Sequence, residues 1–224
     1  MTTTGDENLG LTQRSLAERA RDVIRERITT GTYQPGYRIK ERELSEELGI
    51  SRIPVREALA GLKTEGFITL QPRRGAVVTE LVPEDLREIF ELREALEVQE
   101  VELALRHGSP EERAKLLRVV EKEQSALKSG NGDLVRRYNA EFHEVLIQMT
   151  HNSLLATLLE PLRNRLNWLF KQNDDPSIIC GEHSEIAQAI ASGDAEGARA
   201  LAEAHVATSR RLAHRLLFND GGEA

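Results

Sequence analysis

Hydrophobic and polar positions follow a helical period along most of the chain, and the first part of this pattern predicts three short helices. Ser15 and Glu18 have the spacing of a capping box at the start of the first helix. A glycine ends each apolar stripe, as glycines commonly do at helix C-termini. The three predicted helices run from Leu16 to before Gly31, from Glu41 to Leu48, and from an N-cap at Ser51 to before Gly66.

Two short β-rich runs come next. Phe67–Leu70 and Ala76–Thr79 lie on either side of Gln71–Gly75, a segment that contains a proline, a glycine and two arginines. This arrangement predicts a hairpin with a basic tip, and Pro35-Gly36 predicts a turn before the second helix. Helix, helix, turn, helix and hairpin is the element order of a winged helix-turn-helix domain.

From Pro83 onward the spacing predicts helices throughout, with breaks that contain Gly, Asn or Pro. The segment lengths favour six helices over seven, at residues 83–107, 110–129, 133–150, 153–172, 177–192 and 194–217. We therefore expect a mostly α protein of two domains joined near Glu80–Val82. Residues 10–80 would form the winged helix-turn-helix domain, and residues 83–217 an antiparallel all-α bundle.

The composition fits a helical protein of the cytoplasm. Aromatic residues make up only 4% of the chain, so the core must consist mainly of aliphatic side chains. The apolar runs fall far short of the roughly 18 residues that a membrane span needs, and the polar start lacks the features of a secretory signal. A single cysteine, Cys180, excludes an intramolecular disulfide and fits a reducing compartment.

Charge is distributed unevenly between the two predicted domains. Residues 1–80 carry 13 Lys and Arg against 12 Asp and Glu, a net of +1, whereas residues 81–224 carry 17 against 25, a net of −8. The first domain can still present a basic face, because charges are screened beyond about 10 Å. Arg52 and Arg56 are four residues apart and share one face of the third helix. They could contact DNA, or they could be ordinary surface charges.

The run from Pro35 to Leu59, PGYRIKERELSEELGISRIPVREAL, resembles the DNA-binding domain of GntR-type transcriptional regulators. The similarity continues through Glu65-Gly66 and Arg74-Gly75. It implies contacts with operator DNA from Arg42, Ser51, Arg52, Pro54, Arg56, Arg74 and Gly75, the last two in the minor groove. The chain departs from the family pattern at Ile53, where Thr is more usual, which would remove a hydroxyl contact to phosphate.

Three of the six histidines lie along apolar stripes of different predicted helices. His143, His183 and His205 could each be a hydrogen-bonded core residue, or they could converge inside the bundle to bind a metal. Asn139 precedes His143 by four residues, so both side chains leave the same helix face. Three imidazoles and one oxygen ligand would suit zinc, nickel or another late divalent ion.

Residues 83–217 resemble the FCD ligand-binding domain of the FadR subfamily, through Glu91–Glu97, Asn139–His143, the His183 segment, and Gly193–Ala195 leading to His205. The resemblance implies that Asn139, His143, His183 and His205 are metal ligands, although Asp is commoner than Asn at the first position. It also implies that Arg93 faces the effector pocket; alternatively, Arg93 forms an intrahelical pair with Glu97. Further polar candidates are Arg163, Arg165 and Asn167.

Together these features predict a homodimeric transcriptional regulator, more often a repressor in such families, that binds a palindromic operator. The resemblance implies a small carboxylate effector bound at a metal-containing pocket. One alternative is a regulator whose metal site is structural or vacant. A metalloenzyme is disfavoured, because the chain lacks a His-Glu-x-x-His motif, a glycine-rich phosphate loop and a nucleophile elbow.

Overall fold

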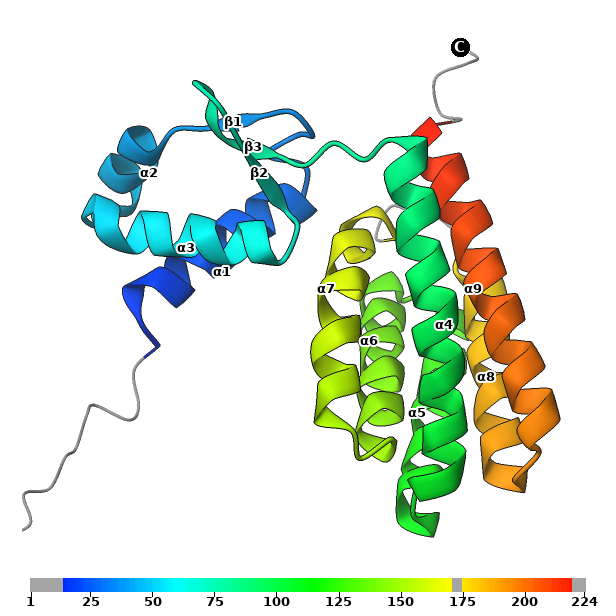
Figure 1. The fold of residues 1–224 in the computed structure, drawn as a ribbon. Coiled ribbons are helices and arrows are strands. Elements are labelled where there is room, and N and C mark those ends of the chain that lie inside the picture. The colour runs from blue at the N-terminus through cyan, green and yellow to red at the C-terminus, as the bar shows by residue number, and fades with distance from the viewer. Residues whose placement is uncertain (1–13, 171–174, 219–224) are drawn as a thin grey trace, which may run out of the picture. The chain divides into compact units, whose positions relative to one another are not determined.

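The structure is a computed structural model that describes residues 14–170 and 175–218, with only the backbone described for residues 164, 165 and 167–170. The chain divides into two compact units between Glu80 and Leu81. Within the described residues, nine helices and three short strands make up these units (Figure 1). The mostly helical class predicted from the sequence is confirmed. Residues 10–13 of the predicted first domain lie outside the described residues.

The first unit contains α1 (Leu16–Thr29), β1 (Arg38–Ile39), α2 (Glu41–Leu48), α3 (Arg52–Thr64), β2 (Ile68–Gln71) and β3 (Gly75–Val78). The Ser15–Glu18 capping box is present, and Gly49 ends α2 in the left-handed conformation, with φ 64°. Helix α1 packs on α3, and buried aliphatic side chains such as Ile24 and Leu62 form the core between them.

The sheet of the first unit is antiparallel, in the order β1-β3-β2. Strand β1 was not predicted from the sequence, because two residues are too few to show the alternation of a strand. The predicted hairpin is present with its strands shifted by one residue, and Gln71 pairs with Gly75 across the turn. Gly75 has φ 75° and Arg73 has φ 65°, so the basic tip is a tight turn in the left-handed region.

The second unit contains α4 (Pro83–His107), α5 (Pro110–Lys128), α6 (Gly132–Met149), α7 (Ser153–Phe170), α8 (Ser177–Ser192) and α9 (Ala195–Phe218). The predicted number of helices is confirmed, and their boundaries agree within two residues. The predicted end of the fourth helix, at residue 172, lies outside the described residues. The helix start at Ser109 is a capping box with Glu112, as its spacing predicts.

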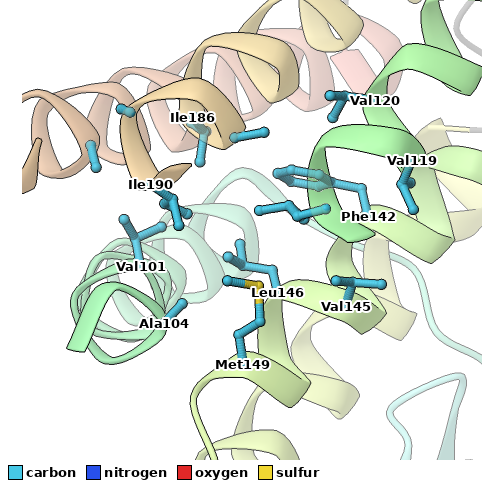
Figure 2. Close-up of a cluster of buried hydrophobic side chains, with 14 of the residues drawn as sticks. Val101, Ala104, Val119, Val120, Phe142, Val145, Leu146, Met149, Ile186 and Ile190 are labelled. Atoms are coloured by element: carbon cyan, nitrogen blue, oxygen red, sulfur yellow. The ribbon is translucent and has the colours of Figure 1, made fainter. Parts of the chain in front are cut away.

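The helices of the second unit lie alongside one another, with α4 against α9 and α5 against α6 and α8 (Figure 1). Their largest core contains Val101, Phe142, Leu146, Met149 and Ile190, which project toward one another from α4, α6 and α8 (Figure 2). No helix in the described part of the chain is long and apolar enough to cross a membrane.

Candidate metal centre and DNA-binding surface

Three histidines from three helices meet inside the second unit. His143 lies on α6, His183 on α8 and His205 on α9, and one possible ligand atom from each lies within 4.8 Å of the others. His183 is completely buried and stacks on the Phe142 ring, with the ring centroids 4.1 Å apart. Since two ligands of one ion lie up to about 4.2 Å apart at bonds of about 2.1 Å, small side-chain rotations suffice for all three to reach an ion.

Two of these imidazoles are held by buried or half-buried carboxylates. Nδ1 of His183 lies 3.1 Å from Oε2 of Glu123, and Nδ1 of His205 lies 2.8 Å from Oε2 of Glu182. Each carboxylate accepts a hydrogen bond from Nδ1–H of its ring, which leaves the lone pair of Nε2 on the opposite side of the ring. Carboxylates behind metal-binding histidines fix the ring orientation and the tautomer in the same way.

Two nitrogen atoms of the cluster are buried without a hydrogen-bond partner, Nδ1 of His143 and Nε2 of His183. Most buried polar atoms in proteins have a partner, so such atoms call for an explanation. The pKa of His143 is held well below its usual range, first by burial and then by the positive charge of Arg163. Burial also lowers the pKa of His183, although the hydrogen bond that the ring donates to Glu123 raises it. Both rings are therefore neutral near pH 7, which is the form that binds metals.

A buried group of charged side chains from α4 and α7 lies next to the histidines. Arg93 Nε donates a hydrogen bond to Glu97 Oε1 at 2.7 Å, and Arg163 donates one to Glu100. The alternative considered for Arg93, an intrahelical pair with Glu97, is therefore present. Nη1 of Arg93 and Nε of Arg163 remain buried without a hydrogen-bond partner. The charges of both arginines lower the pKa of His143, which ties this group to the histidine cluster.

The charges of this group do not balance at neutral pH. Burial raises the pKa of Glu97, but the charges of Arg93 and Arg163 outweigh it and leave the pKa lowered, so Glu97 is ionised. Burial raises the pKa of Glu100 to about 7 despite the neighbouring Arg163. Two guanidinium groups thus face one full carboxylate and one partly protonated carboxyl.

In the first unit, α3 presents its polar face to solvent. Arg52, Ile53 and Arg56 are exposed, and Arg56 Nε donates a hydrogen bond to Glu41 Oε2 at 2.7 Å, which links the starts of α2 and α3. Ser51 occupies the N-cap position of α3, but its side chain makes no capping hydrogen bond. The predicted N-cap position of Ser51 is therefore confirmed, without a hydrogen bond from the helix to its hydroxyl.

The remaining residues predicted to contact DNA also lie in the first unit. Arg42 is exposed on α2, with Nε 3.7 Å from Oε1 of Glu46. Arg74 is exposed at the hairpin tip and donates to Gln71, and Gly75 follows it in a conformation that favours glycine. Pro54 is half-buried on α3. These side chains are positioned by the second helix, the third helix and the wing, as the element order requires.

Comparison with known proteins identifies both units. Residues 16–78 match the family described as bacterial regulatory proteins, gntR family, and residues 88–208 match the FCD domain. YdhC of Bacillus subtilis (strain 168), described as an uncharacterized HTH-type transcriptional regulator, is 31% identical over 187 residues, which cover 81% of this chain and 84% of YdhC. The chain belongs to the gntR family.

Two further similarities agree with this gntR-family assignment. The gluconate operon transcriptional repressor of Bacillus licheniformis is 29% identical over 153 residues, which cover 68% of this chain and 63% of the repressor. The solved structure of E. coli McbR/YncC superposes with a TM-score of 0.74 over 91% of this chain and 99% of McbR, and at 24% identity it shows the same fold.

The gntR-family protein is thus a DNA-binding transcriptional regulator with an FCD domain, and the alternative of a metalloenzyme is wrong. The roles of the individual DNA, metal and effector residues stay predictions. The side chains of Arg165 and Asn167 lie outside the described residues. Sequence reasoning missed Glu123 and Glu182; Glu123 could have been noticed as an acidic residue on the buried stripe of Leu116 and Val120.

Proposed function

We propose that this regulator is a repressor that binds a palindromic operator as a homodimer and responds to a small organic acid at a metal-containing pocket in its FCD domain. The name of the gluconate operon transcriptional repressor supports repression. A two-fold pair of α3 helices would contact two half-sites on one face of the duplex. Since its target is operator DNA, we place its action in the cytoplasm.

The proposed metal ligands are His143, His183 and His205, with Asn139 as the fourth. The observation that carries this proposal is the pair of buried nitrogens without partners, on His143 and His183, beside imidazoles that are oriented by carboxylates. Neutral imidazoles favour zinc or nickel over magnesium or calcium. The Asn139 oxygen, partly buried one turn before His143, is a weaker ligand than a carboxylate and leaves the affinity lower than Asp would.

The proposed effector site lies between the histidines and the buried arginines. A bound dication would supply an open coordination position for a carboxylate of the effector. Nη1 of Arg93 and Nε of Arg163, which have no hydrogen-bond partner, would donate hydrogen bonds to the effector's anionic groups. Arginine suits this role because its planar fork matches a carboxylate and its charge persists when buried. Arg163 thereby joins Arg93 as a predicted effector contact.

Effector binding would act on α7 through Arg163. This side chain connects α7 to α4 through Glu100, and a ligand that competes for the guanidinium would change how the two helices pack. Repacking of the FCD domain would then change the spacing of the two DNA-binding units of a dimer. A ligand shifts such an equilibrium only by its difference in affinity for the two arrangements.

A metal analysis and a thermal-shift screen test this proposal on the full-length protein. We expect near-stoichiometric zinc or nickel in the wild type and in His151→Ala, an exposed histidine, and its loss in His143→Ala. An effector should raise the melting temperature of the metal-loaded protein. At a hundred times its Kd, it would add about 2.7 kcal/mol to the free energy of unfolding. The screen uses monocarboxylates, dicarboxylates and sugar acids. A response that survives chelation would favour a structural or vacant metal site instead.

A further inference from the structure

Ile53 is the largest apolar side chain on the outward face of α3. Ile53 is 68% exposed, whereas Val55, Ala58, Leu59 and Leu62 of the same helix are buried. At about 100° per residue, Ile53 lies opposite the buried stripe, at the middle of the face that points away from the core. Single exposed apolar residues are ordinary on protein surfaces, so the position of Ile53 matters more than its exposure.

The surroundings of Ile53 are polar and basic. Arg52 precedes it, and Arg56 follows one turn later, where Glu41 holds its guanidinium through a hydrogen bond of 2.7 Å. Ile53 offers neither a donor nor an acceptor, so it cannot read the hydrogen-bonding edge of a base. In the major groove the apolar group on a base edge is the C5 methyl of thymine.

We propose that Ile53 is a specificity-determining residue that packs against a thymine methyl group in each operator half-site. Arg52 and Arg56, which share the neighbouring face of α3, would contact guanine edges or phosphates beside it. The inference rests on the proposed contact between α3 and the operator. The proposed contact gives Ile53 a preference for thymine. The threonine that is more usual at this position would not supply such a preference if its hydroxyl contacted phosphate.

Chemical removal of the methyl group tests the contact directly. A duplex operator is first selected from a randomised library with the full-length protein, and each thymine is then replaced by deoxyuridine. We expect wild-type affinity to fall roughly fourfold per half-site at one position, the contribution of one buried methyl group. Ile53→Ala should bind the selected operator more weakly and should show no further loss at that position, whereas Ile53→Val should keep part of the effect.

A matched control separates this contact from general effects of an exposed apolar residue. Leu154 is 67% exposed on α7 in the other unit, and Leu154→Ala should respond to deoxyuridine as the wild type does. Equal deoxyuridine losses in the wild type and Ile53→Ala, or no sensitive thymine at all, would overturn the proposal. If Arg52→Ala also binds the selected operator normally, the proposed role of α3 fails as well; if Arg52→Ala binds weakly, only the thymine contact fails.

Discussion

Nδ1 of His183 lies 3.1 Å from Oε2 of Glu123, and both side chains are completely buried between α5 and α8. Burying a carboxylate costs desolvation free energy, which only good pairing and hydrogen bonding offset. The effect of the Glu123 carboxylate is to fix the imidazole so that Nε2, which has no other partner, points toward His143 and His205. The pair is thus the part of the cluster that most clearly resembles the supporting shell of a metal site.

Replacing Glu123 tests that supporting role. Glu123→Gln keeps the shape of the side chain but removes its charge, so it should weaken metal binding by about 10- to 100-fold. The affinity is measured by competition with a chromophoric chelator. Glu121→Gln, an exposed change on the same helix, should bind metal as the wild type does. Unchanged affinity in Glu123→Gln would mean that this carboxylate has only a packing role.

Arg52 should contribute to operator affinity. It is exposed on α3 beside the N-cap, and Arg52→Ala should weaken binding to a selected operator by roughly 1–3 kcal/mol. Fluorescence anisotropy at one fixed salt concentration measures the change, because salt alone alters such affinities. Arg118→Ala, which removes an exposed arginine from α5, should leave affinity unchanged. An Arg52→Ala protein with wild-type affinity would exclude the assigned role of the third helix.

The buried carboxyl of Glu100 should make stability fall as the pH rises. Burial raises its pKa to about 7 in the folded state, above the ordinary value of 4.5, so the folded protein binds the extra proton between these values. Stability from this group is therefore greatest below pH 4.5 and is lost as the pH rises through 7, by about 3 kcal/mol in total. The free energy of unfolding should decrease from pH 5.5 to 8 through this group.

Glu100→Gln isolates that contribution. The variant cannot ionise, so the change in its free energy of unfolding from pH 5.5 to pH 8 should be more positive than the same change in the wild type. Glu121→Gln again serves as the exposed control on a neighbouring helix and should keep the wild-type dependence. If the Glu100→Gln and wild-type profiles coincide, Glu100 is ionised throughout this range in the folded protein.

Local patterns predicted most of the fold because the apolar period marks the helices and glycine, proline or capping residues mark many of their ends. Ser15 and Ser109 form the capping boxes that their spacing indicates, and the helices between them follow the apolar period. The two-residue strand β1 escaped detection because its pairing with β3 joins residues almost forty positions apart. Periodicity carries no information about such pairings.

In the candidate site, too, features set by local sequence could be predicted, whereas features that depend on distant residues could not. The three histidines were recognisable because each falls on an apolar stripe, and the structure brings them together. Their carboxylate partners could not be recognised from the sequence. Glu123 lies 60 residues from His183, and the sequence does not indicate which buried acid contacts which ring. The unequal pKa values of Glu97 and Glu100 likewise depend on burial and on Arg163, which only the packed bundle defines.

The reactivity of the Cys180 thiol can report on unfolding of the second unit. It is completely buried, and burial, followed by the charge of Glu123, raises the pKa of its thiol to about 12. At pH 8 only on the order of one thiol in 10,000 would be the reactive thiolate, compared with roughly a quarter for a free cysteine. Alkylation of the native protein should therefore be slow and should accelerate sharply in denaturant.

The chain has one cysteine, so the mass added by iodoacetamide reports on Cys180 alone. If opening and closing are fast, the labelling rate follows the population of the open state. Zinc or nickel should then slow labelling of the wild type, because a ligand of the folded state reduces that population. The same metal should protect His143→Ala much less. Labelling of the native wild type as fast as in denaturant would show instead that the thiol is accessible without opening of the bundle.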